Sequence, residues 1–119
     1  MRIVAKVNQL MKIKVKFFQT FRELFDDEVK EIELDNGSSI QDLLNLLCDS
    51  RQRRQKVFDH SGGLRPYIKI LKMEDKGAMQ EHKHFKEYWN GRYIQFLDGV
   101  HTELGEGDVV VIFPPVGGG

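Results

Sequence analysis

The sequence predicts an α+β fold, in which a mixed sheet of about five strands carries one main helix on one face. Three observations lead to this prediction. Several runs alternate apolar and polar residues, which is typical of half-buried strands. One segment repeats apolar residues at the spacing of an amphipathic helix. The last run, "DVVVIF", is apolar almost throughout, as expected of a strand that is covered on both faces.

The N-terminal part predicts a hairpin. "KIKVKFF" alternates lysines with Ile13, Val15 and Phe17, and this period of two places the three apolar side chains on one face. "EVKEIELD" repeats the pattern, with Ile32 and Leu34 opposite the glutamates. Because the short "TFRELFDD" separates the two runs, we expect an antiparallel pair joined by a longer loop.

The helix is predicted directly after the turn residues "DNGSS". Ser38 with Gln41, or Ser39 with Asp42, has the three-residue spacing of a capping box. The apolar stripe behind this cap consists of Ile40, Leu43, Leu44 and Leu47. The polar run "DSRQRRQK" ends or extends the helix.

Three further strands are predicted in the C-terminal part. "PYIKILK" alternates with Ile68 and Ile70 inward, "RYIQFL" follows an Asn90-Gly91 turn, and "DVVVIF" comes last. Two hairpin-linked strands, a crossover helix and a valine-rich final strand describe a β-grasp fold. The right-handed crossover rule and the apolar character of the last strand place that strand in the centre of the sheet.

The chain of 119 residues is expected to form one domain. We assign residues 1–10 to an N-terminal arm and residues 11–119 to the β-grasp domain, which ends in a flexible glycine tail at 117–119. An insertion at about 73–89 contains Met79, Phe85, Tyr88 and Trp89, and these predict a short amphipathic helix at the sheet edge. This helix covers the edge strand or contacts a partner, and the sequence leaves both open.

Composition argues against several classes of function. Eighteen basic residues balance eighteen acidic ones, so we expect no general attraction to nucleic acid or to a membrane surface. No apolar run approaches the ~20 residues that span a bilayer, and the N-terminus has no features of a secretion signal. The single cysteine, Cys48, excludes an internal disulfide framework and agrees with a cytoplasmic location.

Other candidate sites have ordinary explanations. His82 and His84 stand two apart, but no further ligand lies at zinc-like spacing, so we expect no metal site. Cys48 follows the apolar stripe and is interpreted as a small buried hydrophobe. The basic cluster "RQRRQK" is interpreted as a solvated helix end, because nucleic-acid binding needs a wider basic face or interleaved aromatics.

The chain end "VVVIFPPVGGG" carries the chemistry that the rest of the sequence lacks. Glycine buries no side chain and holds no fixed geometry, so three glycines at a chain end contribute nothing to stability. Pro114 and Pro115 fix φ and stiffen the exit from the sheet, so that the tail projects from the domain. A bare carboxylate on an extended glycine tail can thread a narrow channel into another protein. The tail is therefore either a linker or disordered end, or the carboxylate of Gly119 is the reactive group, and these features alone leave both open.

Motifs near both ends resemble the MoaD/ThiS family of ubiquitin-like sulfur carriers. The first motif, of the form T-x-R-E-L, is supplied by Thr20, Arg22, Glu23 and Leu24. The second, an L-x-x-G-D strand followed by prolines and a terminal Gly-Gly, is supplied by Leu104, Gly107, Asp108, Pro114, Pro115, Gly118 and Gly119. The resemblance does not cover the insertion, and Gly117 adds a third glycine where two are usual. The ending is most similar to that of MoaD, the small subunit of molybdopterin synthase.

The resemblance implies a sulfur carrier rather than a stand-alone catalyst. The carboxylate of Gly119, next to Gly118, is adenylated by a MoeB/ThiF-like adenylyltransferase that uses ATP, and the carrier itself binds no cofactor. A persulfide from a sulfur donor then replaces AMP and leaves a thiocarboxylate. A MoaE-like large subunit takes the sulfur into a pterin precursor. The residues expected to contact partners are Phe113, Pro114, Pro115, Val116, Gly117, Phe18 and Phe96.

Two alternatives share these features. Carriers or modifiers of other pathways (thiamine, thiolated tRNA, cysteine synthesis or lysine conjugation) have the same tail and fold. A non-catalytic β-grasp binding module with an incidental tail is the other alternative. The motif alone does not separate them.

Overall fold

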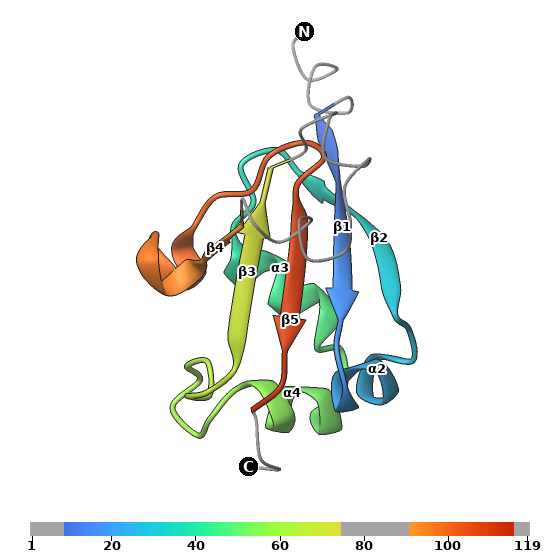
Figure 1. Cartoon of the computed structure of the whole chain (residues 1–119), viewed down its shortest axis with the longest axis vertical. Coiled ribbons are helices and arrows are strands. Elements are labelled where there is room, and N and C mark those ends of the chain that lie inside the picture. Colours follow the sequence, from blue (N-terminus) through green and yellow to red (C-terminus); the bar gives the residue numbers. More distant parts are fainter. Residues whose placement is uncertain (1–8, 75–90, 116–119) are drawn as a thin grey trace, which may run out of the picture.

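The computed structural model describes residues 9–74 and 91–115 of the chain. A five-stranded sheet has the order β2-β1-β5-β3-β4 (Figure 1). The strands are β1 (Leu10–Phe17), β2 (Val29–Asp35), β3 (Lys69–Met73), β4 (Arg92–Tyr93) and β5 (Val109–Phe113). The helices are α2 (Thr20–Phe25), α3 (Ile40–Leu47) and α4 (Arg51–Val57), with 3₁₀ turns η2 (Ile94–Phe96) and η3 (Gly99–His101).

The last strand lies in the centre of the sheet, as predicted. β5 pairs parallel with β1, for example Val15 with Val110, and antiparallel with β3, for example Ile70 with Ile112. β1 and β2 form the expected antiparallel pair, with Ile13 opposite Ile32. The sheet is therefore mixed, and the β-grasp prediction is confirmed.

α2 occupies the longer loop between β1 and β2. Its two buried aromatic side chains, Phe21 and Phe25, return to the core beneath the end of β1. The ring of Phe25 stacks on that of Phe17, with centroids 4.6 Å apart, and Phe21 meets Phe25 edge to face at 5.9 Å. The loop therefore contributes to the core as well as connecting two strands.

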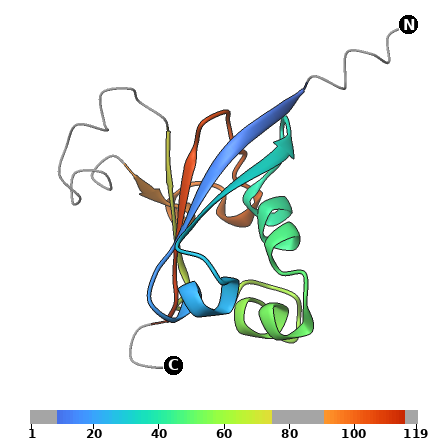
Figure 2. The same ribbon diagram turned by 90° about the vertical axis from the view of Figure 1, so that its right-hand side faces the viewer.

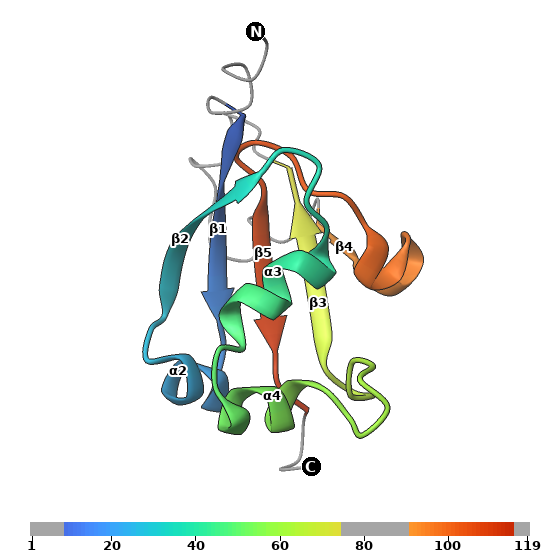
Figure 3. The same ribbon diagram turned by 180° about the vertical axis from the view of Figure 1, so that it is seen from behind.

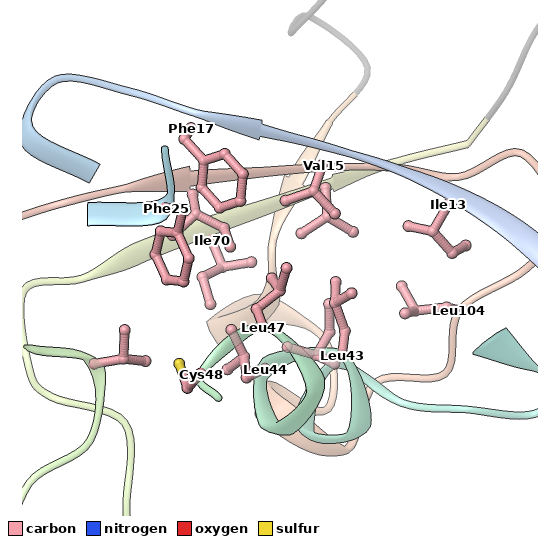
Figure 4. Close-up of a cluster of buried hydrophobic side chains, with 14 of the residues drawn as sticks. Ile13, Val15, Phe17, Phe25, Leu43, Leu44, Leu47, Cys48, Ile70 and Leu104 are labelled. Carbon is pink, nitrogen blue, oxygen red and sulfur yellow. The ribbon is translucent and has the colours of Figure 1, made fainter. Parts of the chain in front are cut away.

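The capping box at the start of α3 uses the second of the two predicted pairs. The Ser39 hydroxyl accepts a hydrogen bond from the backbone N–H of Asp42, and the Asp42 carboxylate accepts one from the N–H of Ser39. The predicted apolar stripe of α3 is buried. α3 lies across one face of the sheet (Figures 2 and 3), so its leucines meet Ile13, Val15 and Phe17 in the core that Figure 4 shows.

The polar run after α3 forms a helix of its own. α3 stops at Cys48, and the side chain of Ser50 caps a new helix by accepting a hydrogen bond from the N–H of Arg53. α4 buries only Val57, while Arg53 anchors it by donating from Nε to the carbonyl of Leu24 at 2.9 Å. A second N-cap therefore explains why the run neither simply ends nor extends the first helix.

The fourth strand is much shorter than predicted. Only Arg92 and Tyr93 pair with β3, and the chain then turns into η2 and η3. The side chain of Ile94 is buried, and the N–H of Leu97 closes the turn on the carbonyl of Ile94 at 2.9 Å. The prediction of a strand over "RYIQFL" was wrong from Ile94 onward, because an inward-pointing isoleucine also fits a turn that packs over the sheet edge.

The L-x-x-G-D motif has a structural role. Leu104 is buried in the core, and Gly107 adopts φ 82°, a conformation that favours glycine. The carboxylate of Asp108 accepts a hydrogen bond from the N–H of Gly105 at 2.8 Å and lies 3.2 Å from the ammonium group of Lys72. Asp108 is 3% exposed, so this ion pair sits inside the fold and fixes the start of β5 against β3.

Several predicted features fall on residues that are not described. The amphipathic helix with Met79, Phe85, Tyr88 and Trp89, and the pair His82 and His84, lie within 75–90. Among residues 9–74 and 91–115, no group of three His, Cys, Asp or Glu side chains is arranged to hold a metal ion. In the same ranges, no helix has both the length and the apolar character needed to cross a membrane.

Cys48 is a buried apolar residue, as the sequence indicated, and we expect it to be unreactive. Burial raises the pKa of its thiol to about 11, although Arg54 and Arg53 lower that pKa in part. Against the ordinary value of 9.0, this leaves about one hundredth of the usual thiolate at pH 8. We therefore expect iodoacetamide to label the native protein about a hundredfold more slowly than the protein unfolded in guanidinium.

The same shift predicts alkaline destabilisation. The folded thiol keeps its proton to a higher pH than the unfolded thiol, so its contribution to stability is complete below pH 9 and is lost as the pH rises towards about 11. A Cys48→Ser variant is the matched control, and its free energy of unfolding should fall less over this range. Equal rates of labelling by iodoacetamide for the native and the unfolded protein would contradict the raised pKa of the Cys48 thiol.

Candidate functional site: the exit of the C-terminal tail

The C-terminal tail leaves the domain from the end of its central strand. After Phe113, Pro114 is buried and Pro115 is partly exposed. Figures 1 and 2 show this exit at the end of the molecule that also carries α2 and α4. The tail therefore starts from the central strand of the sheet, at the end of the molecule where α2 and α4 lie.

An aromatic pair adjoins the exit. The rings of Phe18 and Phe113 lie 4.8 Å apart between centroids, and the N–H of Phe18 donates to the carbonyl of Ile112 at 3.2 Å. The guanidinium of Arg22 lies over the Phe18 ring, 5.5 Å from its centroid, and its Nε donates to the carbonyl of Phe17 at 3.1 Å. Arg22 of the T-x-R-E-L motif thus holds the aromatic pair in place.

Phe113 does not belong to the main core. It packs with Phe18 in a second apolar cluster, on the sheet face opposite α3, whose buried members are Leu71, Met73 and Val111. The main cluster on the helix side contains neither ring. Phe18 and Phe113 are each half-buried, so part of each ring is available for contact with another molecule.

On the helix side the exit opens into a concave surface, which we call the tail-exit concavity. It is lined by α4, by parts of the 58–67 loop, by residues 19–21 and by Pro114 and Pro115, and its volume is about 1290 Å³. Asp59 shapes the loop, since one carboxylate oxygen accepts from the hydroxyl and N–H of Ser61 and from the N–H of Gly63. These hydrogen bonds, that of the Ser61 hydroxyl first, lower the pKa of Asp59.

The structure brings together four of the predicted contact residues. Phe18, Phe113, Pro114 and Pro115 surround the exit. Phe96 is 72% exposed, but it lies in η2 on the lobe beside β4, drawn in orange in Figure 1, and not at the exit. Val116, Gly117, Gly118 and Gly119 lie outside the described residues.

Sequence reasoning missed the tail-exit concavity. "RQRRQK" was interpreted as a solvated helix end, and most of α4 is indeed exposed. Nothing in the spacing indicated that Arg54, Arg65 and the prolines of the tail, which are far apart in sequence, line one surface. The only local signal was the separate N-cap at Ser50, which would have predicted a second helix.

A family model supports the motif assignment. Residues 15–119 match the model of the ThiS family. The chain belongs to the ThiS family. The family comprises ubiquitin-like sulfur carriers and modifiers, so the coarser part of the sequence prediction is confirmed. Small archaeal modifier protein 3 of Haloferax volcanii is 29% identical over 109 residues, which cover 92% of this chain and 100% of that protein.

Solved structures of similar proteins have the same fold. The Haloferax volcanii HVO 2177 protein is 28% identical with a TM-score of 0.67, and the match covers 93% of this chain and 89% of that one. Small archaeal modifier protein 1 of Methanosarcina acetivorans is 26% identical with a TM-score of 0.66, covering 92% and 98%. A Pyrococcus furiosus protein, assigned provisionally as molybdopterin converting factor, subunit 1, is 30% identical with a TM-score of 0.59, covering 89% and 99%. The names of these similar proteins thus include small archaeal modifier proteins and one provisionally assigned molybdopterin converting factor subunit.

Proposed function

We propose that this protein is a sulfur carrier for molybdopterin biosynthesis in the cytoplasm, with the C-terminal carboxylate of Gly119 as its reactive group. The observation that carries the proposal is the tail exit. A rigid central strand delivers Pro114 and Pro115 to the surface between an aromatic pair and a concave wall, and the sequence continues from there as Val-Gly-Gly-Gly. The tail is therefore attached to a strand that is paired on both sides, which favours accurate presentation to a second active site.

The chemistry requires activation, because a carboxylate is a poor electrophile. The carboxylate oxygen attacks the α-phosphate of ATP, pyrophosphate leaves, and an acyl adenylate forms. The terminal sulfur of a donor persulfide attacks the acyl carbon and AMP leaves. A second donor thiol then cleaves the S–S bond, so that the donor is oxidised to a disulfide and the carrier keeps a thiocarboxylate. An adenylyltransferase of the MoeB/ThiF kind supplies the ATP site, and a MoaE-like subunit consumes the sulfur.

Intact mass spectrometry tests this function. The protein is incubated with ATP, a sulfur donor and the adenylyltransferase encoded by the same genome. We expect the mass to rise by the difference between one sulfur and one oxygen atom. ATP consumption by the adenylyltransferase without this gain in mass would contradict the carrier function. If the adenylyltransferase consumed no ATP in the presence of this protein, the protein would be a binding module instead.

A second candidate function is modification of lysines on other proteins. The relatives named small archaeal modifier proteins favour it. The same acyl adenylate would then react with a lysine amine instead of a persulfide. Mass spectrometry of cell proteins for a glycine-terminated remnant on lysine distinguishes the two. A MoaE-like subunit that co-purifies with this protein and converts pterin precursor favours molybdopterin synthesis.

Phe113→Ala is expected to weaken partner binding. Phe113 is half-buried beside Phe18 at the root of the tail, and truncation of such an aromatic anchor costs on the order of 2 kcal/mol of binding free energy. Titration calorimetry with the MoaE-like subunit measures the loss. Leu46→Ala is the matched control, because Leu46 is 50% exposed on α3 and lies outside the aromatic pair. A Phe113→Ala protein that bound with unchanged affinity would contradict the contact role, and one whose fold also collapsed would place Phe113 among the core residues.

A further inference from the structure

We propose that the tail-exit concavity docks an acidic segment of the adenylyltransferase that activates the tail. The inference rests on the proposed function and adds the kind of partner surface that the fold accepts. Its first support is a local excess of positive charge. Of the charged side chains that line the concavity, Arg51, Arg54, Lys56 and Arg65 are cationic, and Asp59 alone is anionic.

That single carboxylate is already engaged. Asp59 accepts three hydrogen bonds within its own loop, including one of 2.7 Å from the Ser61 hydroxyl. The positive charge of Arg65 also lowers the pKa of Asp59. Nε of Arg65 donates to the carbonyl of Gln55 at 2.7 Å. The chain as a whole is neutral, with 18 residues of each charge. The concavity is therefore a segregated basic surface on a neutral protein.

The two sides of α4 differ in how their charge is balanced. Arg53, which faces α2, pairs with Asp49 at 2.9 Å and with Asp26 at 3.4 Å. On the side of the concavity, no ion pair to Arg51, Arg54 or Lys56 is present among residues 9–74 and 91–115. Arg54 lies instead over the ring of Phe58, 4.7 Å from its centroid. Among the described residues, Asp26 and Asp49 therefore pair with Arg53, and the cations on the side of the concavity have no counter-charge there.

A strained aromatic residue stands at the rim. Tyr67 is 77% exposed and has φ 76°, a region that bulky side chains rarely adopt. Gln19, which also lines the concavity, has a positive φ of 54° as well. Backbone strain of this kind concentrates at functional surfaces, and exposed tyrosines are common anchors of protein interfaces. The rim therefore has the composition of a protein-binding surface.

Position favours a protein that holds the tail, and under the proposed function the activating protein is the first to do so. Pro114 and Pro115 form part of the wall, so a protein that holds the tail must also pass along the concavity. Acidic groups on that protein would accelerate association by electrostatic steering. A nucleic acid is a poorer fit, because it needs a wider cationic surface with stacked aromatic side chains. The same chain also presents Glu31 and Glu33 on the exposed face of β2.

The test reverses charges that have no role in the fold. Arg51 and Lys56 are exposed and make no hydrogen bond or ion pair among the described residues, so Arg51→Glu/Lys56→Glu should keep the wild-type thermal midpoint. Adenylation is followed by pyrophosphate release with the adenylyltransferase of the same genome, at low and high salt. We expect KM to rise about tenfold in the double variant at low salt, with kcat unchanged and a weaker dependence of KM on salt.

Two single variants provide the matched comparison. Arg51→Glu should raise KM about threefold, whereas Arg92→Glu, on the edge strand β4 and outside the lining of the concavity, should leave KM at the wild-type value. Wild-type kinetics in the double variant would overturn this inference alone. Loss of tRNA binding in a gel-shift assay, with KM unchanged, would also overturn it and assign the surface to RNA. A wild-type protein that is never adenylated would overturn the proposed function and this inference with it.

Discussion

Removal of Gly118 and Gly119 is expected to abolish sulfur loading while the free energy of unfolding changes by less than about 0.5 kcal/mol. Glycine buries no side chain, so the domain loses no packing. The carboxylate, however, moves back by roughly 7 Å, or two residues of extended chain. An active site that depends on near-attack geometry does not tolerate a displacement of this size. Thermal midpoints and thiocarboxylate yield measure the two effects separately.

Two further variants make the experiment decisive. Removal of Gly119 alone leaves Gly118 at the end, and partial activity would indicate that the third glycine is redundant. A C-terminal tag blocks the carboxylate without shortening the tail, and it should prevent loading completely. A tagged protein that carried sulfur at the wild-type rate, without cleavage of the tag, would refute the assignment of the terminal carboxylate.

Asp108→Ala is expected to lower the free energy of unfolding by about 3 kcal/mol. The substitution leaves the ammonium group of Lys72, whose side chain is only 13% exposed, without its counter-charge. It also leaves the N–H of Gly105 without its acceptor. Removal of one partner of a buried ion pair is more costly than loss of the attraction alone, because the remaining charge stays desolvated. Urea unfolding followed by circular dichroism measures the change.

A double variant distinguishes charge from packing. Lys72→Met/Asp108→Leu removes both charges and keeps apolar volume, so it should recover much of the lost stability. If the double variant were as unstable as Asp108→Ala, the ion pair would not be the cause. Val109→Ala, at the next position of β5 and partly exposed, provides a control for truncation at the start of the strand.

The elements predicted best are those in which the apolar residues of the pattern all lie on one buried face. Every apolar residue of β1 from Ile13 to Phe17 points into the core, and every member of the α3 stripe does the same. The period of their apolar residues therefore corresponds directly to the side chains that are buried. The central place of β5 was predictable from its apolar composition, since Val110 and Ile112 are buried on one face of the sheet and Val111 is buried on the other.

The structural predictions were wrong or incomplete where the local sequence is compatible with more than one secondary structure. "RYIQFL" satisfies a strand pattern, but Gly99 at φ 59° and the hydroxyl of Thr102, which accepts from the N–H of Asp98, stabilise turns that follow. α4 has almost no apolar periodicity, because it is held by the polar contacts of Arg53 and by Val57. The tail-exit concavity joins residues that are distant in sequence. No local pattern could have predicted it.

The pairing of β5 with β1 has a consequence for how the protein acquires its structure. Val110 must find Val15 across 95 intervening steps of the chain, and the parallel alignment admits no short turn between them. Contacts of such long range slow folding, and the sheet cannot close until the ribosome has released residue 113. The hairpin β1–β2 and α3 can form earlier, but they remain an open half-sheet with an exposed apolar face. Under the proposed function, the strand that carries the tail is therefore the last to join the sheet, so that an incomplete domain would not present the tail to an activating enzyme.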